Sequence, residues 1–132
     1  MSKILVTGGA GNVGGALARK LVENSNYEVI IADDLSIGAY SKLPSRRYKN
    51  WKFVHCDVNN YNEFSELMLV NQYDYVFHYA AVVGVKRTQE NPIAVLNDID
   101  GIRNVLQLSK NSSVKRVFFS SSSEVYGEPV AV

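Results

Sequence analysis

The sequence predicts an α/β fold in which helices cover both faces of a doubly wound parallel sheet. Short runs rich in Val, Ile and Phe alternate with segments whose apolar residues recur at helical spacing. A glycine-rich turn separates the first run from the first helical segment. With 132 residues, the chain has the usual length of one domain. Right-handed crossovers then give the strand order 3-2-1-4-5, with ligands expected at the carboxyl ends of strands 1 and 4.

The first half of the chain predicts three strands and one helix. Residues 4–6 are apolar and are followed by glycines, so they predict the first strand. Residues 27–32 and 51–55 are rich in β-branched and aromatic side chains and predict the second and third strands. Gly38 and Pro44 lie in the polar segment between them, which predicts a long surface loop. The helix after the first strand is indicated by Val13, Ala16, Leu17 and Leu21.

The second half predicts two helices and two strands. Residues 74–79 predict a buried fourth strand, and residues 114–119 predict the fifth strand, after which the sheet is expected to be truncated. Pro92 opens the longest helix, residues 92–110. This helix has an apolar stripe that is expected to face a core, formed by Ile93, Leu96, Ile99, Ile102 and Leu106. The helix before the fourth strand is indicated by Tyr61, Phe64, Leu67 and Met68.

The composition excludes several classes of protein. The net charge is +1, from 14 basic and 13 acidic residues, and no basic run could follow a nucleic acid backbone. No apolar run approaches the roughly 20 residues that a membrane helix needs. The first residues lack a secretory signal, and the single cysteine, Cys56, is expected to be a small buried residue. We therefore expect a cytoplasmic protein with no nucleic acid or membrane partner and no metal site.

Glycines at positions 8, 11 and 14 form the clearest chemical motif. Gly8 permits a sharp turn, Gly11 lets the backbone approach a pyrophosphate, and Gly14 lets the helix pack closely on the sheet. Asn12 and Val13 open the helix, whose free N–H groups favour phosphate. An ordinary turn is the alternative. The strand, the helix and the downstream acid that a dinucleotide-binding (Rossmann) motif requires are all present, so the motif is favoured.

Asp33 follows the second strand, about 20 residues beyond the glycines, where a carboxylate can bind the hydroxyls of an adenosine ribose. A 2′-phosphate would meet like charge beside Asp33 and Asp34. The nearest cations lie well along the loop, at Lys42, Arg46 and Arg47. The predicted cofactor is therefore NAD and not NADP. The structural alternatives are a solvated strand end for Asp33 and a loop cap for Asp34.

From end to end, the sequence resembles the extended short-chain dehydrogenase/reductases, and among them the NAD-dependent epimerases and dehydratases of nucleotide sugars. The glycine motif matches that family except that Asn12 replaces an aromatic residue. Residues 33–38 and 56–58 resemble the family's Asp-Asn-Leu-Ser-Thr-Gly and Gly-Asp-Val segments. The resemblance implies that Asp57, next to Val58, contacts the adenine amino group, with a cap or turn residue as the alternative.

Residues 74–81 resemble the family's fourth strand, whose end passes close to the cofactor. The resemblance implies that Ala80 and Ala81 are cofactor contacts. His78 lies in the same strand. It is expected to be a structural histidine, because no carboxylate or nucleophile is tied to it by spacing.

The long helix departs from the family at one position. Aligned on Gly101, the family's Asn-Val-x-Gly motif puts Asp98, and not Asn97, at the asparagine position, so the role of either residue stays open. Gly101 lies inside a helix at a cost of up to about 1 kcal/mol relative to alanine. Its presence indicates close packing against a neighbour.

Residues 119–127 resemble the end of the family's fifth strand. The resemblance implies that Ser122 bonds the reacting sugar hydroxyl. The Ser-Glu that follows is closer to nucleotide-sugar decarboxylases than to many epimerases, which implies that Glu124 assists substrate handling. A strand-end turn, in which serines satisfy backbone groups, is the alternative for the neighbouring serines. The family's Tyr-x-x-x-Lys pair and its substrate domain are expected beyond Val132, so residues 1–132 are expected to form the NAD-binding domain alone.

Two functional hypotheses follow. The first is the cofactor-binding half of an NAD-dependent nucleotide-sugar 4-epimerase, dehydratase or decarboxylase, inactive as 132 residues because the family's Tyr-x-x-x-Lys pair is expected beyond Val132. The one literal match, Tyr48 and Lys52, lies before the third strand and far from the fifth in the sheet order, so it is interpreted as a coincidence. The alternative is a non-catalytic NAD-binding or association module, which would not need Ser122. A homodimer or larger assembly is expected, because the outer edge of the fifth strand is unpaired. The resemblance adds that helix 92–110 lies at the family's dimer interface.

Overall fold

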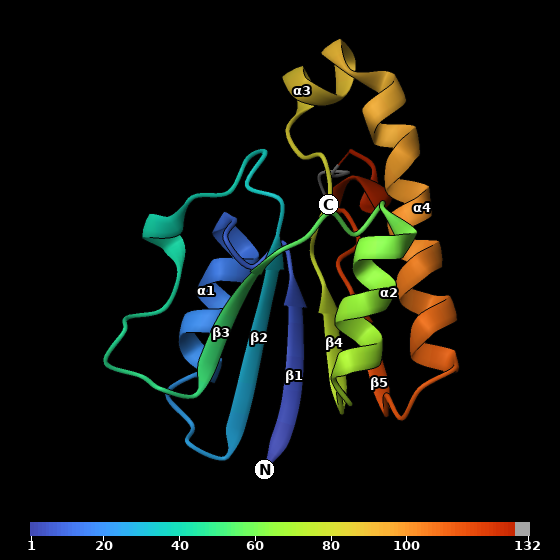
Figure 1. Ribbon diagram of the computed structural model, residues 1–132. Helices are drawn as coiled ribbons and strands as arrows, with labels where there is room; N and C mark the ends of the chain where they lie inside the picture. The colour runs from blue at the N-terminus through green and yellow to red at the C-terminus, as the bar shows by residue number, and fades with distance from the viewer. Residues whose placement is uncertain (129–132) are drawn as a thin grey trace.

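The computed structural model describes residues 1–128, with the side chains of Ser123 and Glu124 outside that description. Its strands form one five-stranded sheet, all of whose pairings are parallel, in the order β3-β2-β1-β4-β5 (Figure 1). The predicted fold class and strand order are therefore confirmed. The strands are β1 (Ser2–Thr7), β2 (Tyr27–Asp33), β3 (Trp51–His55), β4 (Tyr75–His78) and β5 (Arg116–Phe119).

Helices cover both faces of the sheet. α1 (Asn12–Leu21) packs on one face, and α2 (Tyr61–Val70) and α4 (Pro92–Lys110) pack on the other (Figure 1). A further short helix, α3 (Val85–Glu90), was not predicted, because its six residues are mostly polar and give no apolar period. Among the described residues, no helix is long and apolar enough to cross a membrane. The two 3-10 turns are η1 (Tyr40–Lys42) and η2 (Ser123–Tyr126).

Two apolar cores lie on the two faces of the sheet. Alternate residues of a strand point to opposite faces, so Ile4 and Val6 join the core under α1, whereas Leu5 joins the core under α2 and α4. The side chains of Ile4, Leu5 and Val6 are all fully or nearly fully buried. Phe64 of α2 and Val105 of α4 complete the second core. The central strands therefore read as continuous apolar runs, as expected for a parallel sheet buried on both faces.

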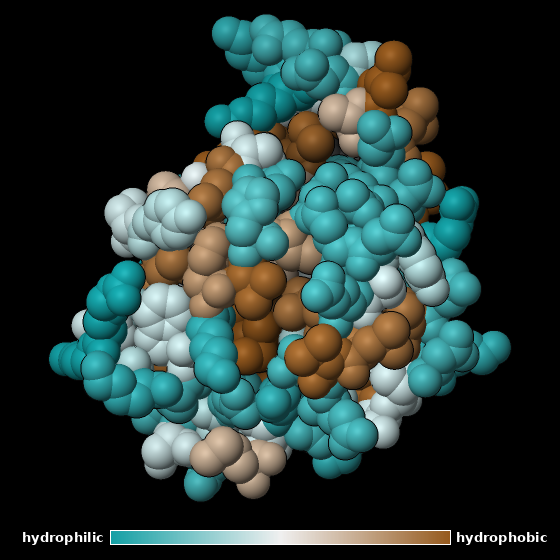
Figure 2. Space-filling model, viewed as in Figure 1, coloured by the Kyte–Doolittle hydropathy of each residue, from teal (hydrophilic) through white to brown (hydrophobic). Residues whose placement is uncertain are grey.

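The prediction that the apolar stripe of α4 faces a core is wrong. Its buried side carries smaller and more polar residues, namely Gly101, Asn104, Val105, Leu108 and Ser109. Four stripe residues are more than half exposed: Ile93 at 73%, Leu96 at 62%, Ile99 at 51% and Leu106 at 54%. Figure 2 accordingly shows apolar side chains at the surface over the upper, N-terminal part of α4. Either side of this helix could pack against the rest of the protein. The side that contains Gly101 is buried against α2 and the sheet, because its small residues allow a closer approach.

A buried polar contact joins β1 to β4 where the strand order reverses. Thr7 Oγ1 lies 2.8 Å from His78 Nδ1. It also accepts hydrogen bonds from the amides of Tyr79 and Ala80, at 3.1 and 3.3 Å. Because these bonds use both acceptor positions of the hydroxyl, its single proton is donated to His78 Nδ1. His78 is therefore a neutral, structural histidine, in agreement with the sequence interpretation.

Acidification is expected to weaken the fold through His78. This residue is 3% exposed, and burial lowers its pKa from 6.5 to about 4, while the charge of Asp98 opposes that shift. Between these values the unfolded chain binds a proton that the folded chain does not. The free energy of unfolding should therefore fall by about 3 kcal/mol between pH 6.5 and pH 4, and the contribution of His78 to the slope should fade as the pH rises above 6.5. Denaturant titrations over this range measure the effect.

His78→Asn keeps an acceptor for Thr7 but removes the titration, so it should flatten the pH dependence below pH 6.5. His55→Asn, at the exposed end of β3, is the matched control and should keep the wild-type slope. Equal slopes in His78→Asn and the wild type would assign the acid sensitivity to other groups.

Candidate functional site

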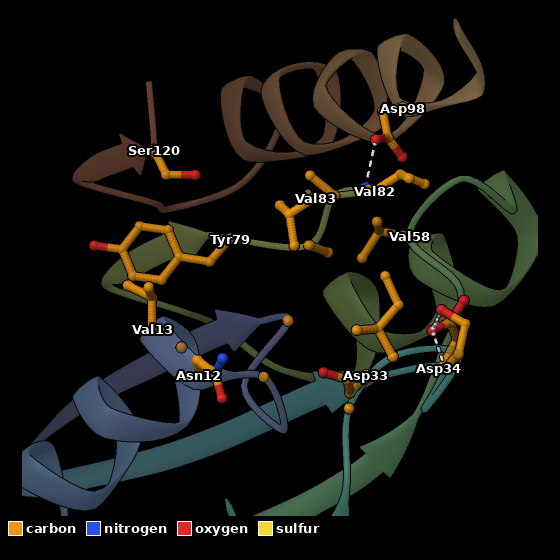
Figure 3. A pocket seen from close by; sticks show the side chains of 18 of the residues that line it. Asn12, Val13, Asp33, Asp34, Val58, Tyr79, Val82, Val83, Asp98 and Ser120 are labelled. Carbon is orange, nitrogen blue, oxygen red and sulfur yellow. Dashed lines mark hydrogen bonds between the residues drawn. The ribbon is translucent and has the colours of Figure 1, made fainter. Parts of the chain in front are cut away.

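A cleft of about 440 Å³ opens at the carboxyl ends of the strands (Figure 3). It lies where β1 and β4 separate, the position expected for a ligand in a doubly wound sheet. The structure brings every residue that the sequence assigned to a cofactor into the lining of this one cleft. They are Gly8, Gly11, Asn12, Val13, Gly14, Asp33, Asp34, Asp57, Val58, Ala80 and Ala81.

The glycine turn forms the floor of the cleft at the start of α1. Gly8 has a φ of +67°, and a Cβ there would lie 2.7 Å from the backbone of Tyr79 and Ala80. A Cβ on Gly14 would overlap the carbonyl oxygen of Gly8, so this glycine lets the helix pack against the turn. α1 begins at Gly11 with no side-chain cap and no acidic residue in its first turn. Its first amides therefore remain available to an anion.

Val13 departs from the predicted pattern. The helical period places it on the apolar side of α1, but it is 67% exposed and lines the cleft. Its neighbour Asn12 also lines the cleft, so the first two side chains of α1 face the cleft and not the core.

Asp33 ties two loops together. Its Oδ2 accepts a hydrogen bond from the amide of Ala10 at 3.0 Å, and its Oδ1 accepts one from the amide of Leu35 at 2.8 Å. A Cβ on Gly38 would lie 2.8 Å from the same Oδ1. With 7% exposure, Asp33 is not a solvated strand end, so that alternative is wrong. Each carboxylate oxygen still has acceptor capacity for a hydroxyl.

Asp34 is exposed at the rim of the cleft and caps its own loop. Its Oδ1 accepts hydrogen bonds from the amide and the hydroxyl of Ser36, at 2.9 and 2.6 Å. Leu35, between them, has a φ of 60°, a region that side-chain-bearing residues rarely adopt. The bonds made by Asp33 and Asp34 hold this unusual backbone in place. The loop-cap interpretation of Asp34 is therefore correct, and it is compatible with lining the cleft.

Asp57 lies in the loop between β3 and α2. Its Oδ1 accepts a hydrogen bond from the amide of Asn59 at 2.9 Å, and its own amide donates to Glu63 Oε2 at 3.0 Å. The turn-residue alternative therefore describes Asp57 correctly, and the residue also lines the cleft. Its neighbour Cys56 is 3% exposed, and burial raises the pKa of the thiol to about 12, which agrees with an inert buried cysteine.

The opposite wall comes from the segment after β4 and from α4 (Figure 3). Val82 and Val83 line it, and the amide of Val82 donates to Asp98 Oδ2 at 2.7 Å. Asn97 is exposed, so Asp98 is the member of this pair that lines the cleft. A carboxylate at this position accepts the amide in a charge-assisted hydrogen bond, which fixes the loop more firmly than a neutral amide oxygen would.

Serines follow β5 at one end of the cleft. Ser120 and Ser121 belong to the lining, and Figure 3 shows Ser120 at the same end as Tyr79. Ser122, which the sequence assigned to the substrate, is exposed, and it is not among the described lining residues. Its carbonyl oxygen accepts the amide of Val125 at 3.3 Å. The side chain of Glu124 lies outside the described residues.

Several lining residues were not assigned to the site from the sequence. Most of them lie within the five residues after a strand, so the rule that ligands bind at the carboxyl ends of parallel strands could have found them. Within residues 1–128, no group of three or more His, Cys, Asp or Glu side chains could hold a metal ion.

Lys42 in η1 and Arg87 in α3 could not have been found in this way, because short polar elements have no hydrophobic period. The unassigned lining residues are Ser36, Ile37, Gly38, Lys42, Cys56, Asn59, Tyr79, Val82, Val83, Arg87, Asp98, Ser120 and Ser121.

Comparison with known proteins identifies relatives over almost the whole chain. A UDP-N-acetyl-alpha-D-glucosaminuronate decarboxylase from Bacillus cytotoxicus is 40% identical over 127 residues, which cover 96% of this chain and 38% of that protein. The structure of a UDP-glucose 4-epimerase from Thermotoga maritima with UDP-glucose has a TM-score of 0.85 and 34% identity, covering 98% of this chain and 41% of that one. A UDP-glucose 4-epimerase from Brucella ovis in complex with NAD has a TM-score of 0.82 and 29% identity, covering 100% and 39%.

The chain therefore spans about two fifths of the length of these relatives. A family model described as the NAD dependent epimerase/dehydratase family matches residues 4–131. This match confirms the family that the sequence resembles, and with it NAD as the cofactor of that family. The chain belongs to the NAD-dependent epimerase/dehydratase family.

Proposed function

We propose that the cleft binds NAD with its pyrophosphate over residues 11–14, its adenosine ribose on Asp33 and its adenine beside Asp57. The nicotinamide half then runs along Ala80 and Ala81 toward the end of β5. This direction follows from the doubly wound sheet, in which a dinucleotide crosses the point where the strand order reverses.

The observation that carries the proposal is that residues assigned to one dinucleotide, from four separate segments of the chain, line a single cleft. The residues also fit the cofactor chemically. The uncapped start of α1 suits a pyrophosphate, and Asp33 has acceptor capacity for ribose hydroxyls. The complex of the Brucella ovis relative with NAD supports the same cofactor.

We further propose that the whole protein acts on a UDP-sugar as a 4-epimerase or a decarboxylase. The relatives with those names support this substrate class. NAD, when bound, supplies an acceptor for hydride from a sugar carbon. Ser122 would bond the reacting sugar hydroxyl at the end of β5, and Glu124 would assist substrate handling. The base that removes the hydroxyl proton would come from the part of the full-length relatives that this chain does not span.

Cofactor preference tests the role of Asp33. NADH should bind at least about tenfold more tightly than NADPH, because a 2′-phosphate would meet Asp33 and Asp34 as like charges. Asp33→Asn removes one of these charges and should narrow the difference. Fluorescence titration with both cofactors measures it. Asp100→Asn, on the exposed side of α4, is the matched control and should keep the wild-type ratio. Tighter binding of NADPH by the wild type would refute the assignment.

Catalysis tests the role of Ser122. In the full-length protein, Ser122→Ala should lower turnover of a UDP-sugar by about 10²-fold, because one transition-state hydrogen bond is lost, with little change in NAD affinity. Ser25→Ala, on an exposed turn, is the control. An equal loss of NAD binding would show that Ser122 is structural.

The 132-residue chain alone should not turn over a nucleotide sugar, because the proposed base does not belong to it. A general base by itself raises the rate of such a reaction by roughly 10²- to 10⁴-fold. Turnover by this chain would mean that the base lies within it.

Glu124→Gln separates the epimerase activity from the decarboxylase activity in the full-length protein. If neither it nor the wild type releases CO₂ from a uronic-acid substrate while both epimerise at the same rate, the decarboxylase assignment falls.

We also propose that the chain self-associates through the apolar stripe of α4. Ile93, Leu96, Ile99 and Leu106 form an exposed apolar row, which costs free energy unless another surface covers it. The edge of the sheet adds a second site, because within residues 1–128 β5 pairs with β4 alone.

Light scattering on the purified chain should therefore report a dimer or a larger assembly. Leu96→Lys places a charge in the apolar row and should shift the assembly toward monomer. Ser25→Lys adds the same charge on an exposed turn outside α4 and should leave the mass unchanged. A monomeric wild type would contradict both the exposed row and the open edge as association sites.

A further inference from the structure

A residue distant in sequence holds the loop that carries Asp57. Asn104 lies in α4 and is 7% exposed. Its Nδ2 donates hydrogen bonds to the carbonyl oxygens of Val58 at 2.9 Å and of Asn59 at 3.4 Å. These are the two residues that directly follow Asp57. A buried side chain of α4 therefore fixes the backbone on the carboxyl side of Asp57.

Gly101, one helical turn earlier on the same side of α4, lets the helix and the loop approach. A Cβ there would lie 2.5 Å from Asn59 Oδ1 and 3.2 Å from Val58 Cγ2. Among the described residues, Asn59 Oδ1 is buried on this contact without a hydrogen-bond partner. The close packing that Gly101 indicates in the sequence is therefore packing against this loop.

The other side of Asp57 is fixed by the sheet. The amide of Cys56 donates to the carbonyl oxygen of Asp33 at 3.1 Å, which continues the pairing of β2 with β3. Asp57 thus lies between one anchor on β2 and one on α4, and its own amide is also held by Glu63 of α2. Removing the amide of Asn104 would release the second anchor and leave two carbonyl oxygens without that donor.

We propose that Asn104 is a positioning residue for the adenine end of the cleft. It does not line the cleft, but it sets the position of the Asp57 carboxylate through the backbone of Val58 and Asn59. This inference rests on the proposed NAD site. A hydrogen bond from the adenine amino group to Asp57 tolerates only small displacements of the carboxylate, so loosening the loop weakens that bond specifically.

The test compares NAD with nicotinamide hypoxanthine dinucleotide, in which oxygen replaces the 6-amino group of adenine. The wild type should bind NAD about tenfold or more tightly than this analogue, because the oxygen at position 6 can only accept a hydrogen bond and is repelled by the Asp57 carboxylate. Asn104→Ala should bind NAD about tenfold more weakly and the analogue within about threefold of the wild type. The preference for NAD would then largely disappear. A role in overall stability would instead weaken the binding of both dinucleotides by the same factor.

Two further variants complete the experiment. Gln107→Ala removes an exposed side-chain amide from the same helix and should keep the wild-type preference. Gly101→Ala pushes a methyl group against Asn59 and should also reduce the preference, so it decides the matter if Asn104→Ala does not fold. Equal losses for both dinucleotides, or an unchanged preference, overturn the role of Asn104. A wild type that binds neither dinucleotide overturns the NAD site itself.

Discussion

The close approach between the glycine turn and the end of β4 is the constraint on which the cleft depends. Only a residue without a Cβ can occupy position 8, because the backbone there has a positive φ and touches the peptide between Tyr79 and Ala80. The Thr7 hydroxyl fastens the same two segments by accepting both amides and donating to His78. β1 and β4 are thus held at a fixed separation at their ends, and the cleft opens immediately beyond them.

Around this point, side chains that hydrogen-bond to backbone groups hold the walls of the cleft. Asp33 joins the glycine turn to the loop after β2, and Asp98 joins α4 to the segment after β4. Asn104 holds the loop after β3 from the far side. Loops at the ends of strands lack ladder hydrogen bonds, so such contacts must satisfy their amides and carbonyls. A carboxylate that accepts one amide can accept another donor, so Asp33 can serve both the fold and a ligand.

α4 has two different surfaces, and most of its bulky apolar side chains lie on the outer one. Gly101 and Asn104 face inward because the helix must come within contact distance of the loop after β3 and satisfy its carbonyl oxygens. Ile99 and Leu106, which are bulkier, are left on the outside, more than half exposed. The helix therefore packs inward by close contact and hydrogen bonding and presents outward the kind of surface that a second molecule can cover.

The sequence by itself determined the fold class, the strand order, the family and many of the residues that line the cleft. These follow from local signals: apolar runs bounded by glycine, and an acid at a set distance from the glycine motif. Only the tertiary structure decided which side of α4 is buried, that Asp98 and not Asn97 reaches the cleft, and that Asn104 holds the loop of Asp57. A helical period indicates that a helix has an apolar side. Which side packs against the protein depends on contacts between residues far apart in the chain, and a local sequence pattern does not contain that information.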